Sequence, residues 1–205
     1  MPHPWKLFNK IAPYALTLFL IVAILFGITF RLVTLDQKVY WHDEAHTTLR
    51  AAGYRGDEVL EEFFFRNQLI SPGELLKYQQ MKPGSTPLDT LNSLAIEDPQ
   101  HSPLYFLFAR GWMLMFGSSI VASRLLPVLM SLISLPLIYL LAWELFQSSL
   151  TALLATALLA LSPIEILFAQ TARQYSLLTL MVILSSYALL KAVRWRDPLT
   201  WECIL

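Results

Sequence analysis

The sequence predicts an all-α, multi-pass membrane protein with about four transmembrane helices. Of the 205 residues, 56% are apolar and only 15% are charged, whereas a soluble domain carries about 25% charged residues. Uncharged stretches long enough to cross a bilayer recur along the chain. A charged segment with several turn signals separates the first stretch from the others. We expect that segment to form a large outer loop containing juxtamembrane amphipathic helices.

The first apolar stretch predicts a spanning helix at residues 12–33. Ala12 to Phe30 carries no charge over nineteen positions, which at about 1.5 Å per residue approaches the ~30 Å thickness of a hydrocarbon core. Lys6 and Lys10 resemble the basic start of a signal peptide, but the stretch is too long and lacks a small-x-small cleavage site. We therefore expect this helix to stay in the membrane.

Residues 34–118 are expected to form the outer loop with interfacial helices. The segment holds most of the acidic residues and the turn signals SPGE, KPGSTP and EDPQHSP. Within it, residues 57–67 (DEVLEEFFFRN) place acids before an aromatic cluster, which is typical of an amphipathic helix lying on an apolar surface.

The apolar segment 102–117 could cross the membrane or lie flat on it, because it is short and has Arg110 in its middle. A crossing would place the basic residues after the last span opposite the N-terminal lysines, against the positive-inside bias. A helix lying flat in the interface agrees better with the positive-inside bias. The N-terminus is then cytoplasmic, and the 31–124 region shares the outer face of the cytoplasmic membrane with the turn at 169–176.

Three further spans are predicted at 120–145, 149–168 and 174–193, where apolar runs lie between charged residues. Residues 194–205 look like the cytoplasmic start of a next helix. We therefore expect one membrane domain over residues 1–205, and we expect it to be the N-terminal portion of a longer protein.

The charges exclude one class of partner. Fifteen basic and fifteen acidic residues cancel, so no global field attracts nucleic acid. The tetrapeptide DEAH is not accompanied by the phosphate-binding G-x-x-x-x-G-K-[ST] loop that a helicase needs. We expect membrane lipid and lipid-borne substrates as partners, and no nucleic acid.

Residues 41–54 (WHDEAHTTLRAAGY) place two carboxylates and two imidazoles just after the first span. Asp43 and Glu44 suit the first turn of a helix that Gly53 closes, since acids favour the positive end of the helix dipole. The functional alternative is that adjacent carboxylates beside lipid have easily shifted pKa values, so that one of them can accept a proton. These residues alone leave both interpretations open.

The histidines raise the question of a metal site. His42 and His46 are four residues apart, which puts two imidazoles on one helix face, but Glu44 does not hold the second position of an H-E-x-x-H zinc motif. The many outer carboxylates would allow a divalent cation, although no set of ligands has diagnostic spacing.

Arg173 lies in the turn AQTARQYS and has two interpretations. A helix-end arginine can snorkel to the interface, or its fork of donors can bind a lipid-linked phosphate. Asp98 and His101, just before a helix-starting proline, are either turn residues or site residues. Glu165 is a functional candidate because of its depth in the membrane. Since Asp43, Glu44, His101 and Arg173 are all expected at the outer face, one site could collect these four residues.

These features together resemble the N-terminal part of the type C glycosyltransferases, the group of the protein O-mannosyltransferases and the lipid A aminoarabinose transferase. The resemblance rests on one span followed by an outer loop beginning Asp-Glu-Ala, on DPQHSPLYF, and on the blocks SRLLPVLMSLISLPLIYLLAWELF and ALSPIEILFAQTARQYSLL. It covers roughly residues 12–195. It implies a multi-pass enzyme that moves a sugar from a polyprenyl phosphate to a lipid, glycan or protein acceptor on the outer side of the membrane.

The resemblance also implies roles for single residues. The family's catalytic acid in the first outer loop corresponds to Asp43, with Glu44 as its neighbour, and the arginine that contacts the donor phosphate corresponds to Arg173. His101 stands at the family's H-P-P position, where Ser102 replaces the first proline. Family members usually continue for several more helices and a second outer loop, which contribute to the donor and acceptor sites.

The predicted mechanism is inverting transfer, in which Asp43 removes a proton from the acceptor while Arg173, helped by Arg50, stabilises the leaving phosphate. The rival is a non-catalytic membrane module that binds a lipid phosphate, such as a carrier or assembly subunit, or an inactive fragment of a transferase. The candidate site residues are Asp43 and Glu44 for catalysis, Arg173 and Arg50 for the donor phosphate, and Asp98, His101, Gln170, Tyr175 and His46 for the substrate.

Overall fold

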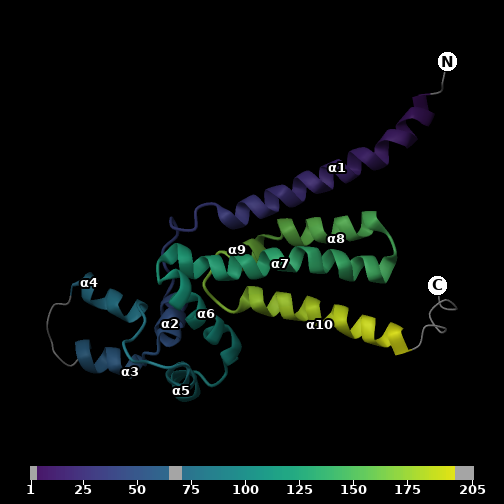
Figure 1. Cartoon of the computed structure of the whole chain (residues 1–205). Helices are drawn as coiled ribbons and strands as arrows, with labels where there is room; N and C mark the ends of the chain where they lie inside the picture. The colour runs from purple at the N-terminus through teal and green to yellow at the C-terminus, as the bar shows by residue number, and fades with distance from the viewer. Residues whose placement is uncertain (1–3, 65–70, 197–205) are drawn as a thin grey trace. The chain divides into compact units, whose positions relative to one another are not determined.

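The computed structural model describes residues 4–64 and 71–196, in which helices are joined by turns and irregular segments and no strand occurs (Figure 1). The all-α class is thereby confirmed. The end of the predicted 57–67 helix and most of the predicted 194–205 segment lie outside the described residues. In chain order the helices are α1 (Pro4–Leu32), α2 (His42–Ala52), α3 (Gly56–Val59), the π-helix η1 (Leu60–Phe64), α4 (Pro72–Leu75), the 3₁₀-helix η2 (Leu76–Gln79), α5 (Pro87–Glu97), α6 (Pro103–Phe116), α7 (Ile120–Phe146), α8 (Ser149–Leu161), α9 (Pro163–Ala169) and α10 (Tyr175–Arg196).

Among these described helices, three are long and apolar enough to cross a membrane: Tyr14–Leu32 of α1, Ile120–Phe146 and Tyr175–Arg194 of α10. A fourth span exists if α8 and α9 together form one span. The pair is long and apolar enough to cross a membrane, but it is bent by 61°. The protein is therefore a membrane protein with three or four candidate spans.

The bend between α8 and α9 has a local cause in the Ser162-Pro163 dipeptide. Proline has no backbone N–H to donate, and it disfavours a helical conformation in the residue before it. Ser162 accordingly has a ψ of 119°. The continuous helix predicted at 149–168 is therefore interrupted at this point.

The chain folds as two compact units, and each is described by itself. The membrane-helix unit comprises Met1–Val33, Leu129–Leu167 and Ser176–Leu205. The loop unit comprises Thr34–Val128 and Phe168–Tyr175. Helix α7 contributes its first residues to the loop unit and the rest to the membrane-helix unit.

In the membrane-helix unit, α1 packs closely on α8. Leu20 and Ala23 of α1 form an apolar cluster with Ala157 of α8. One turn further along, a Cβ at Gly27 would lie 2.4 Å from the carbonyl oxygen of Ala160. The two helices can approach this closely only because residue 27 has no side chain.

Arg31 at the end of α1 is fully buried and caps the broken end of α8. Its Nη2 donates to the carbonyl of Leu159 at 3.0 Å, and its Nη1 donates to the carbonyl of Ala160. In a continuous helix the Leu159 carbonyl would pair with residue 163, which is proline and has no N–H. Arg31 thus satisfies oxygens that the bend leaves without their helical partners.

In the loop unit, helix α2 packs against α5, α6 and η2. The backbone N–H of Trp41 donates to the Glu44 carboxylate at 3.0 Å, and Gly53 closes the helix with a left-handed φ of 92°. The prediction of a helix opened by Asp43 and Glu44 and closed by Gly53 is therefore confirmed.

Arg110, the charge in the middle of the apolar helix α6, is buried against polar groups of the loop unit. Its Nη2 donates to the carbonyl of Ser85 at 2.7 Å and to the Ser85 hydroxyl at 2.9 Å. Its Nη1 donates to the carbonyl of Ala51 at 3.2 Å. The arginine therefore joins α6 to the end of α2 and to the segment before α5.

Candidate functional site

Asp43 and Arg173 lie together in the loop unit, although they are far apart in the chain. Asp43 comes from the first turn of α2, and Arg173 comes from the turn between α9 and α10. Arg173 Nη2 lies 3.7 Å from Asp43 Oδ2, and Arg173 Nη1 donates to Thr47 Oγ1 at 3.2 Å. The side chain of Arg173 is 8% exposed and that of Asp43 is 44% exposed. A fixed guanidinium thus stands beside an accessible carboxylate.

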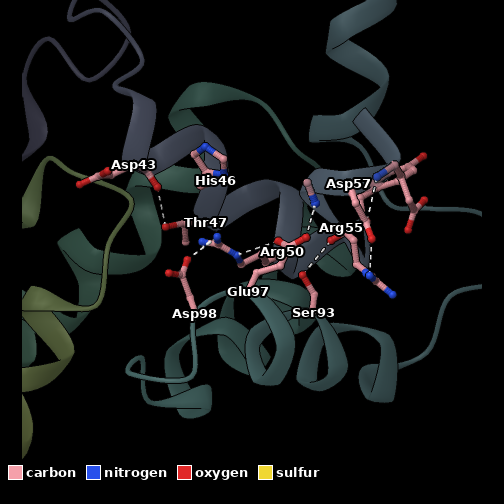
Figure 2. Close-up of polar contacts among 12 residues, drawn as sticks. Asp43, His46, Thr47, Arg50, Arg55, Asp57, Ser93, Glu97 and Asp98 are labelled. Atoms are coloured by element: carbon pink, nitrogen blue, oxygen red, sulfur yellow. Dashed lines mark hydrogen bonds and ion pairs between the residues drawn. The ribbon is translucent and has the colours of Figure 1, made fainter. Parts of the chain in front are cut away.

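Thr47 connects this pair to the helix backbone. Its hydroxyl donates to the Asp43 carbonyl, a bond of 2.8 Å that is dashed in Figure 2. The same hydroxyl accepts from Arg173. Because Thr47 is itself buried, its hydroxyl gives the guanidinium a defined position beside the first turn of α2.

The pKa of Asp43 lies below that of an ordinary aspartate. Burial alone would raise the pKa, but the positive charge of Arg173 and hydrogen bonds with Trp41 and His42 outweigh it. Asp43 is therefore ionised at neutral pH.

Glu44 is buried and its carboxylate is fully used by protein donors. Oε1 accepts from Arg124 Nε at 2.9 Å and from the Ala172 backbone N–H at 2.7 Å. Oε2 accepts from Arg124 Nη2 at 2.7 Å and from the Trp41 backbone N–H at 3.0 Å. A carboxylate that accepts four hydrogen bonds has its acceptor positions filled. The two neighbouring acids therefore have different surroundings, since only Asp43 faces outward.

Arg124, at the start of α7, is absent from the residues that the sequence nominates for the site. Its side chain is 2% exposed, and it forms the ion pair with Glu44. The signal that could have found it is a lone arginine in the apolar run SSIVASRLLP. A charge in such a run needs a partner inside the protein.

Arg50, predicted at the donor phosphate, is instead shared between two carboxylates of the loop unit (Figure 2). Its Nη2 pairs with Asp98, and its Nε lies 3.6 Å from Glu97 Oε2. Glu97 also accepts from the Gly56 backbone N–H at 2.6 Å. Arg50 thus joins α2 to the end of α5, and Glu97 joins the end of α5 to the start of α3.

His42 and His46 are in contact on one face of α2, with their Nε2 atoms 3.1 Å apart. His42 Nδ1 lies 3.6 Å from Asp43 Oδ1. Burial, the positive charge of Arg50 and the neighbouring His42 ring lower the pKa of His46, which is therefore neutral at pH 7. Both histidines line a cavity of ≈ 200 Å³ with Ala45, Leu49, Val59, Leu75, Tyr78 and Gln79.

No metal centre is visible among residues 4–64 and 71–196. No group of three or more His, Cys, Asp or Glu residues in these ranges could hold a metal ion. The two histidines of α2 form a pair and not a group of three.

The remaining predicted residues surround the turn that carries Arg173. Gln170 is buried and its Oε1 accepts from Lys38 Nζ. Tyr175 stacks on Phe168, with ring centroids 4.5 Å apart. Lys38 thus holds the start of this turn, and the ring stack brings the two ends of the turn together.

His101 reaches the same turn from the segment before α6. Its Nδ1 lies 3.2 Å from Gln174 Nε2. Of the other acids considered, Glu165 belongs to the membrane-helix unit and accepts from Thr179 Oγ1 at 3.1 Å.

Comparison with known proteins shows a match to a protein family. The family model for dolichyl-phosphate-mannose-protein mannosyltransferases matches residues 100–205, just over half of the chain. The matched region contains His101, Arg124 and Arg173, whereas Asp43 and Glu44 lie before it. No curated protein and no solved structure matches the chain.

The match confirms the resemblance noted in the sequence, and it agrees with an all-helical fold with several candidate spans. The chain therefore belongs to the dolichyl-phosphate-mannose-protein mannosyltransferase family, which consists of membrane glycosyltransferases with a polyprenyl-phosphate sugar donor.

Proposed function

We propose that this chain transfers a sugar from a polyprenyl phosphate to an acceptor on the outer face of the cytoplasmic membrane, with inversion at the sugar. The observation that carries the proposal is the Asp43–Arg173 pair. An accessible, ionised carboxylate lies 3.7 Å from a buried guanidinium. A transferase of this family needs a base for the acceptor and a cation for the departing phosphate.

In the proposed step, Asp43 accepts the proton of an acceptor hydroxyl or amine. The acceptor atom forms a bond to the anomeric carbon as the bond from that carbon to the phosphate oxygen breaks. The polyprenyl phosphate leaves with the electron pair. Attack on the side opposite the leaving group inverts the anomeric centre, and no covalent enzyme intermediate is required.

Arg173 is the proposed partner of the phosphate. Its Nε is buried and, within the described residues, has no hydrogen-bond partner. A buried unpaired donor costs free energy, and a phosphate oxygen would satisfy it. A guanidinium held by Thr47 also keeps its orientation as charge grows on the leaving group.

The other candidates take supporting roles in this proposal. Arg50 already pairs with Asp98 and Glu97, which favours a role in holding α2 over contact with the phosphate. Glu44 is assigned to anchoring and not to proton transfer, because its oxygens are filled.

Substrate contacts are proposed for residues beside the turn and on the open face of α2. His101, Gln170 and Tyr175 surround the Arg173 turn and are candidates for the sugar. His46 lines the cavity beside the first turn of α2 and is a candidate for the acceptor.

The test is sugar transfer by the full-length protein in detergent, supplied with polyprenyl phosphates carrying mannose, glucose or 4-amino-4-deoxy-arabinose and with an envelope extract as acceptor. We expect wild type to release polyprenyl phosphate and to form an inverted product. Asp43→Asn should abolish release, and Arg173→Gln should slow it by about 10²- to 10³-fold. Arg55→Gln is the matched control, because Arg55 forms only a partly exposed pair with Asp57.

A lipid-phosphate-binding module would give another pattern. It would bind the donors equally in wild type and in Asp43→Asn, and neither protein would release the sugar. Wild-type transfer by Asp43→Asn would remove the base assignment and the proposed mechanism with it.

A further inference from the structure

The Glu44 carboxylate joins the two segments that carry the proposed base and the proposed phosphate ligand. Glu44 directly follows Asp43 in α2. Its Oε1 accepts from the backbone N–H of Ala172, which directly precedes Arg173, at 2.7 Å. One buried side chain therefore links the backbones on which the Asp43–Arg173 pair is built.

Arg124 uses all of its N–H donors to bind Glu44 and the segment that precedes α2. Nε and Nη2 bind Glu44, and Nη2 also donates to the carbonyl of Val39 at 3.0 Å. Nη1 donates to the carbonyls of Leu35 at 2.6 Å and Lys38 at 3.2 Å. Each of the five N–H groups of a guanidinium thus has an acceptor. The segment before α2, the first turn of α2 and the turn between α9 and α10 are all held, directly or through Glu44, by this one side chain.

We propose that the buried Glu44–Arg124 ion pair sets the separation of Asp43 and Arg173, which makes Arg124 a positioning residue for sugar transfer. The inference rests on the proposed function, since it concerns the geometry of that same site. Arg124 acts through Glu44 and Ala172, and it touches neither donor nor acceptor.

Stability alone is a poor explanation for this pair. Taking two charges out of water is costly, and buried ion pairs often contribute no more stability than apolar residues of the same size. Geometry is the better explanation, because a guanidinium fork can bind a carboxylate through two parallel N–H groups and keep three more for carbonyls. Lysine has one compact charge and cannot make this pattern.

The experiment compares Arg124→Lys and Glu44→Gln with Arg110→Lys in the full-length enzyme, using the polyprenyl-phosphate sugar that wild type turns over. Arg110 is the matched control because it is also a buried arginine that donates to backbone and hydroxyl groups, but it lies away from Glu44. The measurements are the thermal midpoint, kcat and KM per folded enzyme, the pH profile of kcat/KM, and hydrogen exchange of a peptide covering residues 168–175.

We expect Arg124→Lys and Glu44→Gln to lower kcat by about 10²-fold, a loss that misplacing a reacting group by about 1 Å can cause. Exchange in the 168–175 peptide should accelerate. The acid limb of kcat/KM should move to higher pH, because Arg173 no longer stands beside Asp43. Arg110→Lys should lower the thermal midpoint and leave kcat per folded enzyme and the pH profile unchanged.

The positioning role is overturned if Arg124→Lys and Glu44→Gln keep the wild-type kcat and acid limb, or if Arg110→Lys loses as much kcat as they do. Should Arg124→Lys fail to fold, the result for Glu44→Gln is decisive by itself, because glutamine keeps the size of the side chain and one acceptor oxygen but removes the charge and the second acceptor. Failure of the proposed function looks different: Asp43→Asn then remains active, and both proposals fall.

Discussion

Asp43 and Glu44 show how neighbouring residues of one chemical type acquire different properties. Successive positions on a helix point about 100° apart, so Asp43 faces outward beside Arg173 while Glu44 points inward to Arg124. The accessible acid keeps a lowered pKa because its environment favours the charged form. It is the one of the two that can meet a substrate.

The pH dependence of transfer should follow from this pKa. Since Arg173 lowers the pKa of Asp43, the carboxylate stays ionised to lower pH than an ordinary aspartate, and activity should persist there. Arg173→Gln removes the charge, so the pKa of Asp43 should rise and activity should be lost at a higher pH. The acid limb of kcat/KM, which reports groups of the free enzyme, measures this change. An acid limb identical in wild type and Arg173→Gln would argue against Asp43 as the titrating group, and Arg55→Gln again serves as control.

At the scale of helices, the close packing of α1 and α8 depends on Gly27. Gly27→Ala places a Cβ 2.4 Å from a backbone oxygen of α8, so the helices must move apart. Such overpacking typically costs about 1–3 kcal/mol, and we expect a lower thermal midpoint in detergent. Gly111→Ala in α6 is the control, because its Cβ would meet nothing within 4 Å. Equal midpoints for the two variants would contradict the close approach.

The bend between α8 and α9 is also an element-scale feature with a sequence signal and a structural consequence. Pro163 removes a donor from the helix, and Arg31 supplies donors to the carbonyls near the break. A buried arginine at the end of a membrane helix is otherwise costly. The proline therefore accounts for the burial of the arginine, because Arg31 supplies the donors that are missing at the break. The residues next to Arg31 in the sequence do not indicate this role.

At the scale of the whole molecule, the loop unit constrains how the chain crosses the membrane. Arg124 at the start of α7 and the turn at 170–174 belong to the same unit and meet at Glu44. A chain that leaves one membrane face through α7 must return to that face before residue 170. We therefore expect α8 and α9 together to serve as one bent span, which makes four spans within residues 4–64 and 71–196.

Accessibility labelling tests this arrangement. In a Cys203→Ser background, Val39→Cys should react with an impermeant maleimide added from outside intact cells, because Val39 is 90% exposed in the loop unit. Gln147→Cys, in the turn between α7 and α8, should react only after the membrane is permeabilised. Labelling of both positions from the same side would contradict a crossing by α7.

The sequence by itself determined the fold class, the run of apolar helices and the nomination of Asp43 and Arg173. These features depend on the length of apolar stretches, on helix start and stop signals and on a family pattern, all of which can be read along the chain. Only the tertiary structure decided that Glu44 is buried and that its ion-pair partner is Arg124 and not a cation nearer in the sequence. It also decided that Arg50 forms an ion pair with Asp98 and that Arg31 caps the end of α8. The physical reason is that a buried charge takes its partner from whatever segment lies within a few ångströms, and in this protein those segments are often more than eighty positions away along the chain.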